Sequence, residues 1–109
     1  METEQKHCKP CEGIGKAFDQ ADVKKHLAEL DKNWQLSQDG KQISRDFQFK
    51  NYYQTMAFVN GIAWMAHKEN HHPDLEVGYN HCLVRYSTHS LDGLTENDFI
   101  CAAKVDRLF

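Results

Sequence analysis

Apolar residues recur at helical spacing in the first patterned segment of the chain. Val23, Leu27 and Leu30 share one face of residues 21–30, and Asp22 stands near the start, where a negative charge favours a helix N-terminus. This segment is therefore predicted to be an amphipathic helix.

The pattern then changes from helical spacing to alternation. Trp34 and Leu36 alternate with polar residues, and Asp39-Gly40 supplies a hairpin turn. Residues 43–49 place an isoleucine, an arginine and two phenylalanines on one face, with polar residues on the other. Such alternation is typical of antiparallel strands with one face against the core, and the arginine is the one charged member of that face.

Residues 51–67 carry the strongest helix pattern, and their apolar residues form two stripes rather than one. Phe58, Ile62 and Met65 make one stripe. The other consists of Tyr52, Met56, Val59, Ala63 and Ala66. A helix that is apolar on two sides cannot simply lie on a sheet with its back to water. In so small a domain, we expect the second stripe to form an interface, giving a homodimer or homotetramer through this helix and the sheet edges.

A second hairpin and a last helix complete the pattern. Residues 75–79 and 82–86 alternate on either side of a turn at Asn80-His81, and Thr95 begins a helix with an acid at its third position, as in a capping box. The predicted order is α-β-β-α-β-β-α. The expected fold is α+β, a four-stranded antiparallel sheet with helices packed on one face.

Length and charge narrow the class of function. The chain has 109 residues and a net charge of −3, so a single domain is predicted at residues 18–109, after a loosely ordered N-terminal leader at residues 1–17. The absence of a basic patch argues against nucleic acid. The leader has no apolar core of a signal peptide, and no apolar run is long enough to span a membrane. The expected location is the cytoplasm.

The sequence contains no complete motif for metal binding or for a catalytic nucleophile. His67 and His71 stand four positions apart, but Lys68 occupies the place where the H-E-x-x-H motif needs glutamate. Cys8 and Cys11 form a C-x-x-C without a second ligand pair. There is no G-x-S-x-G elbow and no glycine cluster that could cradle phosphate. No metal and no cofactor are expected, although a small metal-binding protein that uses these cysteines and histidines is one alternative.

Three histidines are the remaining candidates for chemistry. His71 and His72 precede Pro73 after the long helix, and His89 ends the last predicted strand. The proline disfavours a helical conformation at the residue before it. Imidazoles exchange protons near neutral pH, so two of them that reach one pocket from separate elements can donate and accept protons in a single elimination.

The motifs around these histidines resemble those of the pterin-4a-carbinolamine dehydratase family. The specific part of the resemblance is the set His71-His72-Pro73, Tyr79, Ser87-Thr88-His89, Gly93-Leu94-Thr95 and Asp98. Further matches upstream are Leu27, Leu30, Trp34 and Phe47-x-Phe49-Lys50-Asn51, so that the resemblance runs from about residue 19 to residue 108. The C-x-x-C leader and the last helix are similar to the bacterial branch.

The resemblance implies a dehydratase that removes water from 4a-hydroxytetrahydropterin, the carbinolamine left by aromatic amino acid hydroxylases. The product is quinonoid dihydropterin, which a reductase returns to the tetrahydro form. By the same resemblance His71 and His89 are the acid–base pair, with their individual roles open, and His72 positions the pterin. The implied substrate-binding residues are Asn70, Pro73, Ser87, Thr88, Ser90, Trp34 and Asp98.

Two positions depart from the family pattern. His67 stands where many members carry a glutamate, and Asp92 replaces a glycine that precedes Gly93. Glu69 is a candidate to replace the missing negative charge. The alternative function is a non-catalytic protein-binding or regulatory module that uses the two-faced helix 51–67, since animal members of the family also act as dimerisation cofactors for a homeodomain transcription factor.

Overall fold

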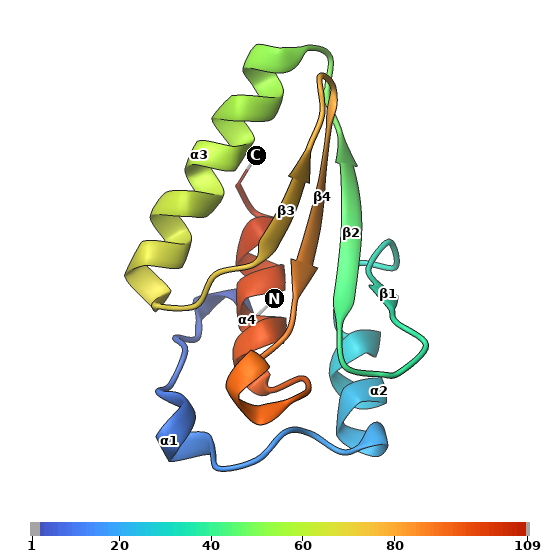
Figure 1. The fold of residues 1–109 in the computed structure, drawn as a ribbon, viewed down its shortest axis with the longest axis vertical. Helices are drawn as coiled ribbons and strands as arrows, with labels where there is room; N and C mark the ends of the chain where they lie inside the picture. Colours follow the sequence, from blue (N-terminus) through green and yellow to red (C-terminus); the bar gives the residue numbers. More distant parts are fainter. Residues whose placement is uncertain (1–2, 109) are drawn as a thin grey trace.

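A four-stranded antiparallel sheet forms the centre of the molecule, as the computed structural model shows for residues 3–108 (Figure 1). Its spatial order is β1-β2-β4-β3, with β1 at Gln35–Leu36, β2 at Ile43–Gln48, β3 at Asp74–Val77 and β4 at His81–Tyr86. The main helices are α2 at Gln20–Ala28, α3 at Tyr52–Glu69 and α4 at Glu96–Val105. The predicted α+β fold and its element order are confirmed. Three short helices add to it, η1 at Thr3–Gln5, α1 at Cys11–Ile14 and η2 at His89–Leu91.

Strand register places the core on one face of the sheet. Ile43 pairs with Tyr86 and Phe47 with Cys82, and all four side chains are buried. The opposite face carries partly or fully exposed side chains, among them the ion pairs His81–Asp46 and Arg85–Glu76. This is the alternation that the sequence pattern predicts. The helices cover the apolar face, and α4 is buried along most of its length.

Arg45, the charged member of the apolar face, is held by carboxylates at the edge of the core. Its guanidinium donates to Asp106 at 2.9 Å, lies 3.5 Å from Asp31 and stacks over the Phe47 ring at 4.4 Å. The indole N–H of Trp34 also donates to Asp106, at 2.9 Å. Burial raises the pKa of the Asp106 carboxyl, although these two donors oppose the shift. The arginine therefore pairs with a partly buried acid at the edge of the core instead of interrupting the core.

The long helix α3 begins at the N-cap Asn51, whose side chain accepts the Gln54 N–H at 2.9 Å. The stripe of Phe58, Ile62 and Met65 is buried, as expected. The second stripe is only partly covered, since Tyr52 and Ala63 are exposed whereas Ala66 is buried. Outside this stripe, Tyr53 is 81% and Trp64 63% exposed. Among the described residues no helix is both long and apolar enough to cross a membrane.

The second hairpin turns one residue earlier than predicted. Gly78 donates its N–H to the His81 carbonyl at 2.9 Å, so Tyr79-Asn80 forms the turn and His81 already belongs to β4. A side chain at position 78 would meet the His81 ring at 2.5 Å. The His81 ring thus packs directly against the backbone of Gly78.

Candidate active site

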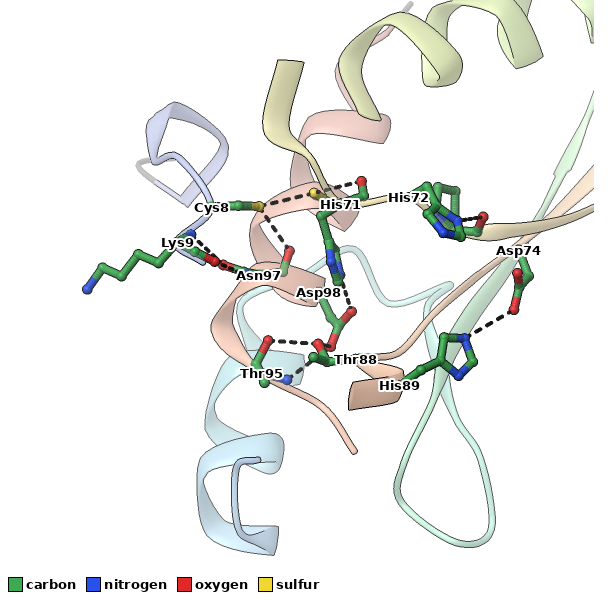
Figure 2. A network of polar contacts seen from close by, with 12 residues as sticks. Cys8, Lys9, His71, His72, Asp74, Thr88, His89, Thr95, Asn97 and Asp98 are labelled. Atoms are coloured by element: carbon green, nitrogen blue, oxygen red, sulfur yellow. Dashed lines mark hydrogen bonds and ion pairs between the residues drawn. The ribbon is translucent and has the colours of Figure 1, made fainter. Parts of the chain in front are cut away.

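His71 and Asp98 form the innermost polar pair of the candidate site (Figure 2). Asn70 ends α3 in the left-handed conformation, with φ 53°, and turns the chain so that the His71 ring faces the start of α4. There His71 Nε2 lies 2.7 Å from Asp98 Oδ1. The His71 side chain is 11% exposed and that of Asp98 is fully buried. The pair therefore sits at the boundary between core and solvent.

The second oxygen of Asp98 is bound by α4 and by the end of β4. Oδ2 accepts the Thr88 hydroxyl at 2.8 Å and the Thr95 backbone N–H at 3.0 Å, which is half of the predicted capping box. Three donors and the helix N-terminus stabilise the carboxylate anion. Since a carboxylate only accepts, the proton of neutral His71 is expected on Nε2. In this tautomer Nδ1 carries no proton and can accept one.

The ring of Tyr86 forms the inner wall behind His71. The two rings lie 5.8 Å apart at an angle of 15°, a stacked arrangement. The Tyr86 hydroxyl is buried and has no hydrogen-bond partner among the described residues, and burial raises the pKa of the phenol well above its usual value. Tyr86 thus restricts the imidazole without offering it a charge. The sequence pattern predicted Tyr86 only as a member of the strand at residues 82–86; its position on the same strand face as Thr88 was the available signal.

His72 and His89 are both exposed, and Figure 2 shows them on the side of His71 away from Cys8. His72 Nδ1 is 3.0 Å from the Pro73 carbonyl oxygen, to which it can donate. His89 is 75% exposed, with Nε2 3.6 Å from Asp74 Oδ2. The structure therefore provides one rigidly held histidine and two that solvent reaches freely.

The predicted substrate-binding residues fall into two groups. Asn70 and Ser90 are exposed and Ser87 is half-buried, so a ligand can reach these side chains. Four others are buried: Pro73, Thr88, Asp98 and Trp34. Thr88 and Asp98 bind each other, and the indole N–H of Trp34 is taken by Asp106. Their locations favour a supporting role over direct contact with a ligand.

Glu69, the candidate to replace the missing negative charge, has hydrogen-bond partners other than His71, His72 and His89. Its carboxylate faces the N-terminal segment, where it accepts the Cys8 N–H at 2.8 Å and lies 2.9 Å from His7 Nδ1 and 3.8 Å from Lys104 Nζ. Burial opposes its ionisation, but these partners outweigh burial and the pKa of Glu69 lies below its usual value. His67 is exposed and stacks on Trp64 at 5.6 Å.

Asp92 stands in the loop after His89, at the position where the family pattern suggested a glycine. Its φ of 52° is left-handed, a conformation that costs side-chain-bearing residues energy and glycine none. Its carboxylate is 2.8 Å from Lys41 Nζ, which links this loop to the β1–β2 hairpin.

A Glu69→Gln variant is expected to lose about 2 kcal/mol of stability at neutral pH, since hydrogen bonds to charged groups contribute about that much. Because the folded-state pKa of Glu69 is lowered, its contribution is present above the ordinary value of 4.5 and is lost as pH falls through the folded-state pKa. Urea unfolding at a series of pH values should therefore show the two proteins converging in acid. The exposed Glu29→Gln is the control, and a difference that does not depend on pH would contradict the assignment.

The N-terminal segment, predicted to be a loosely ordered leader, makes specific contacts with the domain. Cys8 Sγ lies 3.4 Å from Cys101 Sγ, and the Phe18 N–H donates to the Leu94 carbonyl at 2.7 Å. All four cysteines are free thiols. Within residues 3–108, no cluster of three or more histidine, cysteine or acidic side chains is arranged to hold a metal ion.

Comparison with known proteins identifies the family. A family model described as pterin 4 alpha carbinolamine dehydratase matches residues 16–108. A protein from Legionella pneumophila (strain Corby), provisionally named as such a dehydratase, is 59% identical over 103 residues, which cover 94% of this chain and 91% of the relative. A protein from Nitrosomonas europaea with the same provisional name is 61% identical over 102 residues, covering 94% and 88%.

Solved structures agree with these sequence relatives. A transcriptional coactivator/pterin dehydratase from Brucella melitensis superposes with a TM-score of 0.79 at 32% identity, covering 84% of this chain and 96% of its own. A pterin dehydratase-like protein identified as a RuBisCO assembly factor in the alpha-carboxysome superposes with a TM-score of 0.61 at 25% identity, covering 70% and 88%. The fold, the histidine motifs and the match over residues 16–108 together show that this chain belongs to the pterin-4a-carbinolamine dehydratase family.

Proposed function

We propose that this protein removes water from 4a-hydroxytetrahydropterin to give quinonoid dihydropterin, and so recycles the pterin of aromatic amino acid hydroxylases in the cytoplasm. The observation that carries the proposal is the His71–Asp98 hydrogen bond of 2.7 Å, which orients an imidazole at the edge of the core. The family match and the dehydratase names of its relatives support the same reaction.

The reaction needs one proton delivered and one removed. The C4a–O bond breaks as its hydroxyl takes a proton and leaves as water, and a ring nitrogen loses its proton as the C=N bond forms. His71 suits the second step, because a proton accepted at Nδ1 makes an imidazolium that the buried Asp98 carboxylate stabilises. His89 suits the first step, because solvent can reload it beside Asp74. His72 is exposed, and we assign it to positioning the pterin. Asn70, Ser87 and Ser90 are assigned to the same role.

The cofactor-recycling role can be tested in a coupled assay. An aromatic amino acid hydroxylase generates the carbinolamine from limiting tetrahydropterin, and a dihydropterin reductase reports product formation through its consumption of reduced nicotinamide. If dehydration limits the cycle, addition of this protein should raise the reductase rate. An unchanged rate, under conditions where spontaneous dehydration is limiting, would contradict the proposal.

The second candidate function is a protein-binding module that uses the outer face of α3. The exposed aromatic residues Tyr53 and Trp64 favour it, and the Brucella relative is described as a coactivator as well as a dehydratase. The ordered His71–Asp98 pair is not needed for such a role, and for this reason the dehydratase is the leading proposal.

The same outer face supports self-association. Large exposed aromatic groups on a small domain mark interaction surfaces, and we expect light scattering to give the mass of a dimer or tetramer. Trp64→Glu would place a charge on this exposed face and should lower the measured mass, whereas Gln38→Glu in the β1–β2 hairpin should not. A wild-type monomer at micromolar concentration would contradict this expectation.

A further inference from the structure

Residues 7 and 8 contact the end of the helix from which His71 emerges. The backbone N–H of Cys8 donates to Glu69 Oε1 at 2.8 Å, and the preceding histidine ring lies 2.9 Å from Oε2 of the same side chain. Glu69 is the last residue of α3 and stands two positions before His71. The N-terminal segment is thus bonded to α3 beside the point where the chain turns into the site.

The next residue of the segment is bonded to the start of α4. The Asn97 side chain accepts the Lys9 backbone N–H at 2.9 Å and donates to the Lys9 carbonyl at 2.7 Å (Figure 2). Asn97 is buried, with 3% exposure, and directly precedes Asp98. The Cys8 thiol adds a weaker contact to the Asn97 carbonyl at 3.7 Å. Two consecutive backbone units therefore bridge the element that carries His71 and the element that carries Asp98.

We propose that residues 8 and 9 brace these two elements, and that Asn97 and Glu69 are positioning residues for the His71–Asp98 hydrogen bond. The catalytic meaning of the brace rests on the proposed dehydratase function. Its physical basis is that a hydrogen bond of 2.7 Å weakens steeply when donor and acceptor shift, and small displacements of a reacting group reduce rates strongly. Residues 8 and 9 precede residue 16, where the match to the family model begins.

The test is Asn97→Ala, compared with Thr55→Ala. Loss of both bonds to Lys9 should lower kcat about tenfold with little change in KM, because the misplaced group acts in the transition state. The ring Nε2–H resonance of His71 in proton NMR, protected from exchange by Asp98, should broaden or disappear. Thr55 is fully buried and donates to the Tyr79 carbonyl at the other end of α3. Thr55→Ala therefore also removes a buried hydrogen bond, but it leaves the contacts of residues 8 and 9 intact.

A conservative variant and the NMR signal keep the outcomes distinct. Asn97→Asp retains the acceptor for the Lys9 N–H and loses the donor, so it should give an intermediate kcat; it also replaces the alanine variant if that protein fails to fold. Wild-type kcat and an unchanged His71 resonance in both variants would overturn the brace. If the wild-type protein does not dehydrate the carbinolamine, the proposed function fails, whereas the resonance still decides whether Asn97 positions His71.

Discussion

Replacing His71 with glutamine is expected to lower kcat for dehydration by about 10²- to 10⁴-fold, the usual contribution of a positioned acid–base group. Glutamine can still donate to Asp98, so the fold and much of the site geometry should persist. It cannot take up a proton at neutral pH, and the developing charge that Asp98 stabilises would not form. KM should change far less than kcat, because the imidazole acts on the transition state more than on binding.

A matched control separates this effect from the general loss of a histidine. His81 is also a hydrogen-bonded histidine, 3.1 Å from Asp46, but it lies in the β3–β4 hairpin on the exposed sheet face. His81→Gln should keep the wild-type kcat. His89→Gln should lose activity, though less than His71→Gln, because an exposed group is partly replaced by water. An H71Q protein with wild-type kcat would remove His71 from the mechanism.

Asp98→Asn is expected to have the second largest effect, a fall in kcat of about 100-fold. The comparison is with carboxylates that orient metal-bound histidines, whose loss typically costs 10- to 100-fold. The substitution removes the charge that stabilises protonated His71. It also directs an amide NH₂ at donors, either the Thr88 hydroxyl and Thr95 N–H or the His71 N–H. The variant should therefore lose about 1–3 kcal/mol of stability as well.

The stability loss can be matched by a variant that keeps the three hydrogen bonds accepted by the Asp98 carboxylate. Thr95→Ala removes the N-cap hydroxyl of α4, at a cost of about 1 kcal/mol, while the Thr95 N–H still donates to Asp98. Urea unfolding and steady-state kinetics on both variants separate the two effects. If Asp98→Asn and Thr95→Ala lose similar stability and both keep wild-type kcat, Asp98 serves only as a helix cap.

The fold was predictable because its signals are local. The alternation in residues 43–49, the Asp39-Gly40 turn and the two stripes of residues 51–67 each follow from the period of one element. The hairpin turn lies one residue earlier than predicted, because its position is defined by the backbone hydrogen bond between Gly78 and His81, which the pattern of polar residues does not show.

The site was only partly predictable, because its bonds join distant parts of the chain. The sequence identified His71, and it identified the acid at position 98 as a capping residue, but the pair is separated by 27 positions and depends on how α3 ends against α4. The contacts of the N-terminal segment were invisible for another reason. Glu69 and Asn97 bind backbone groups of Cys8 and Lys9, and every residue carries such groups whatever its side chain.

The most direct test of the central claim is the decay of freshly generated 4a-hydroxytetrahydropterin, followed by its ultraviolet absorbance in the presence of a metal chelator. The proposed mechanism uses only side chains of this protein, so the wild-type protein should accelerate the decay to quinonoid dihydropterin with the chelator present, and His71→Gln should lack most of that acceleration. A decay rate equal to that of buffer alone, or an acceleration that the chelator abolishes, would contradict a dehydration driven by the histidines.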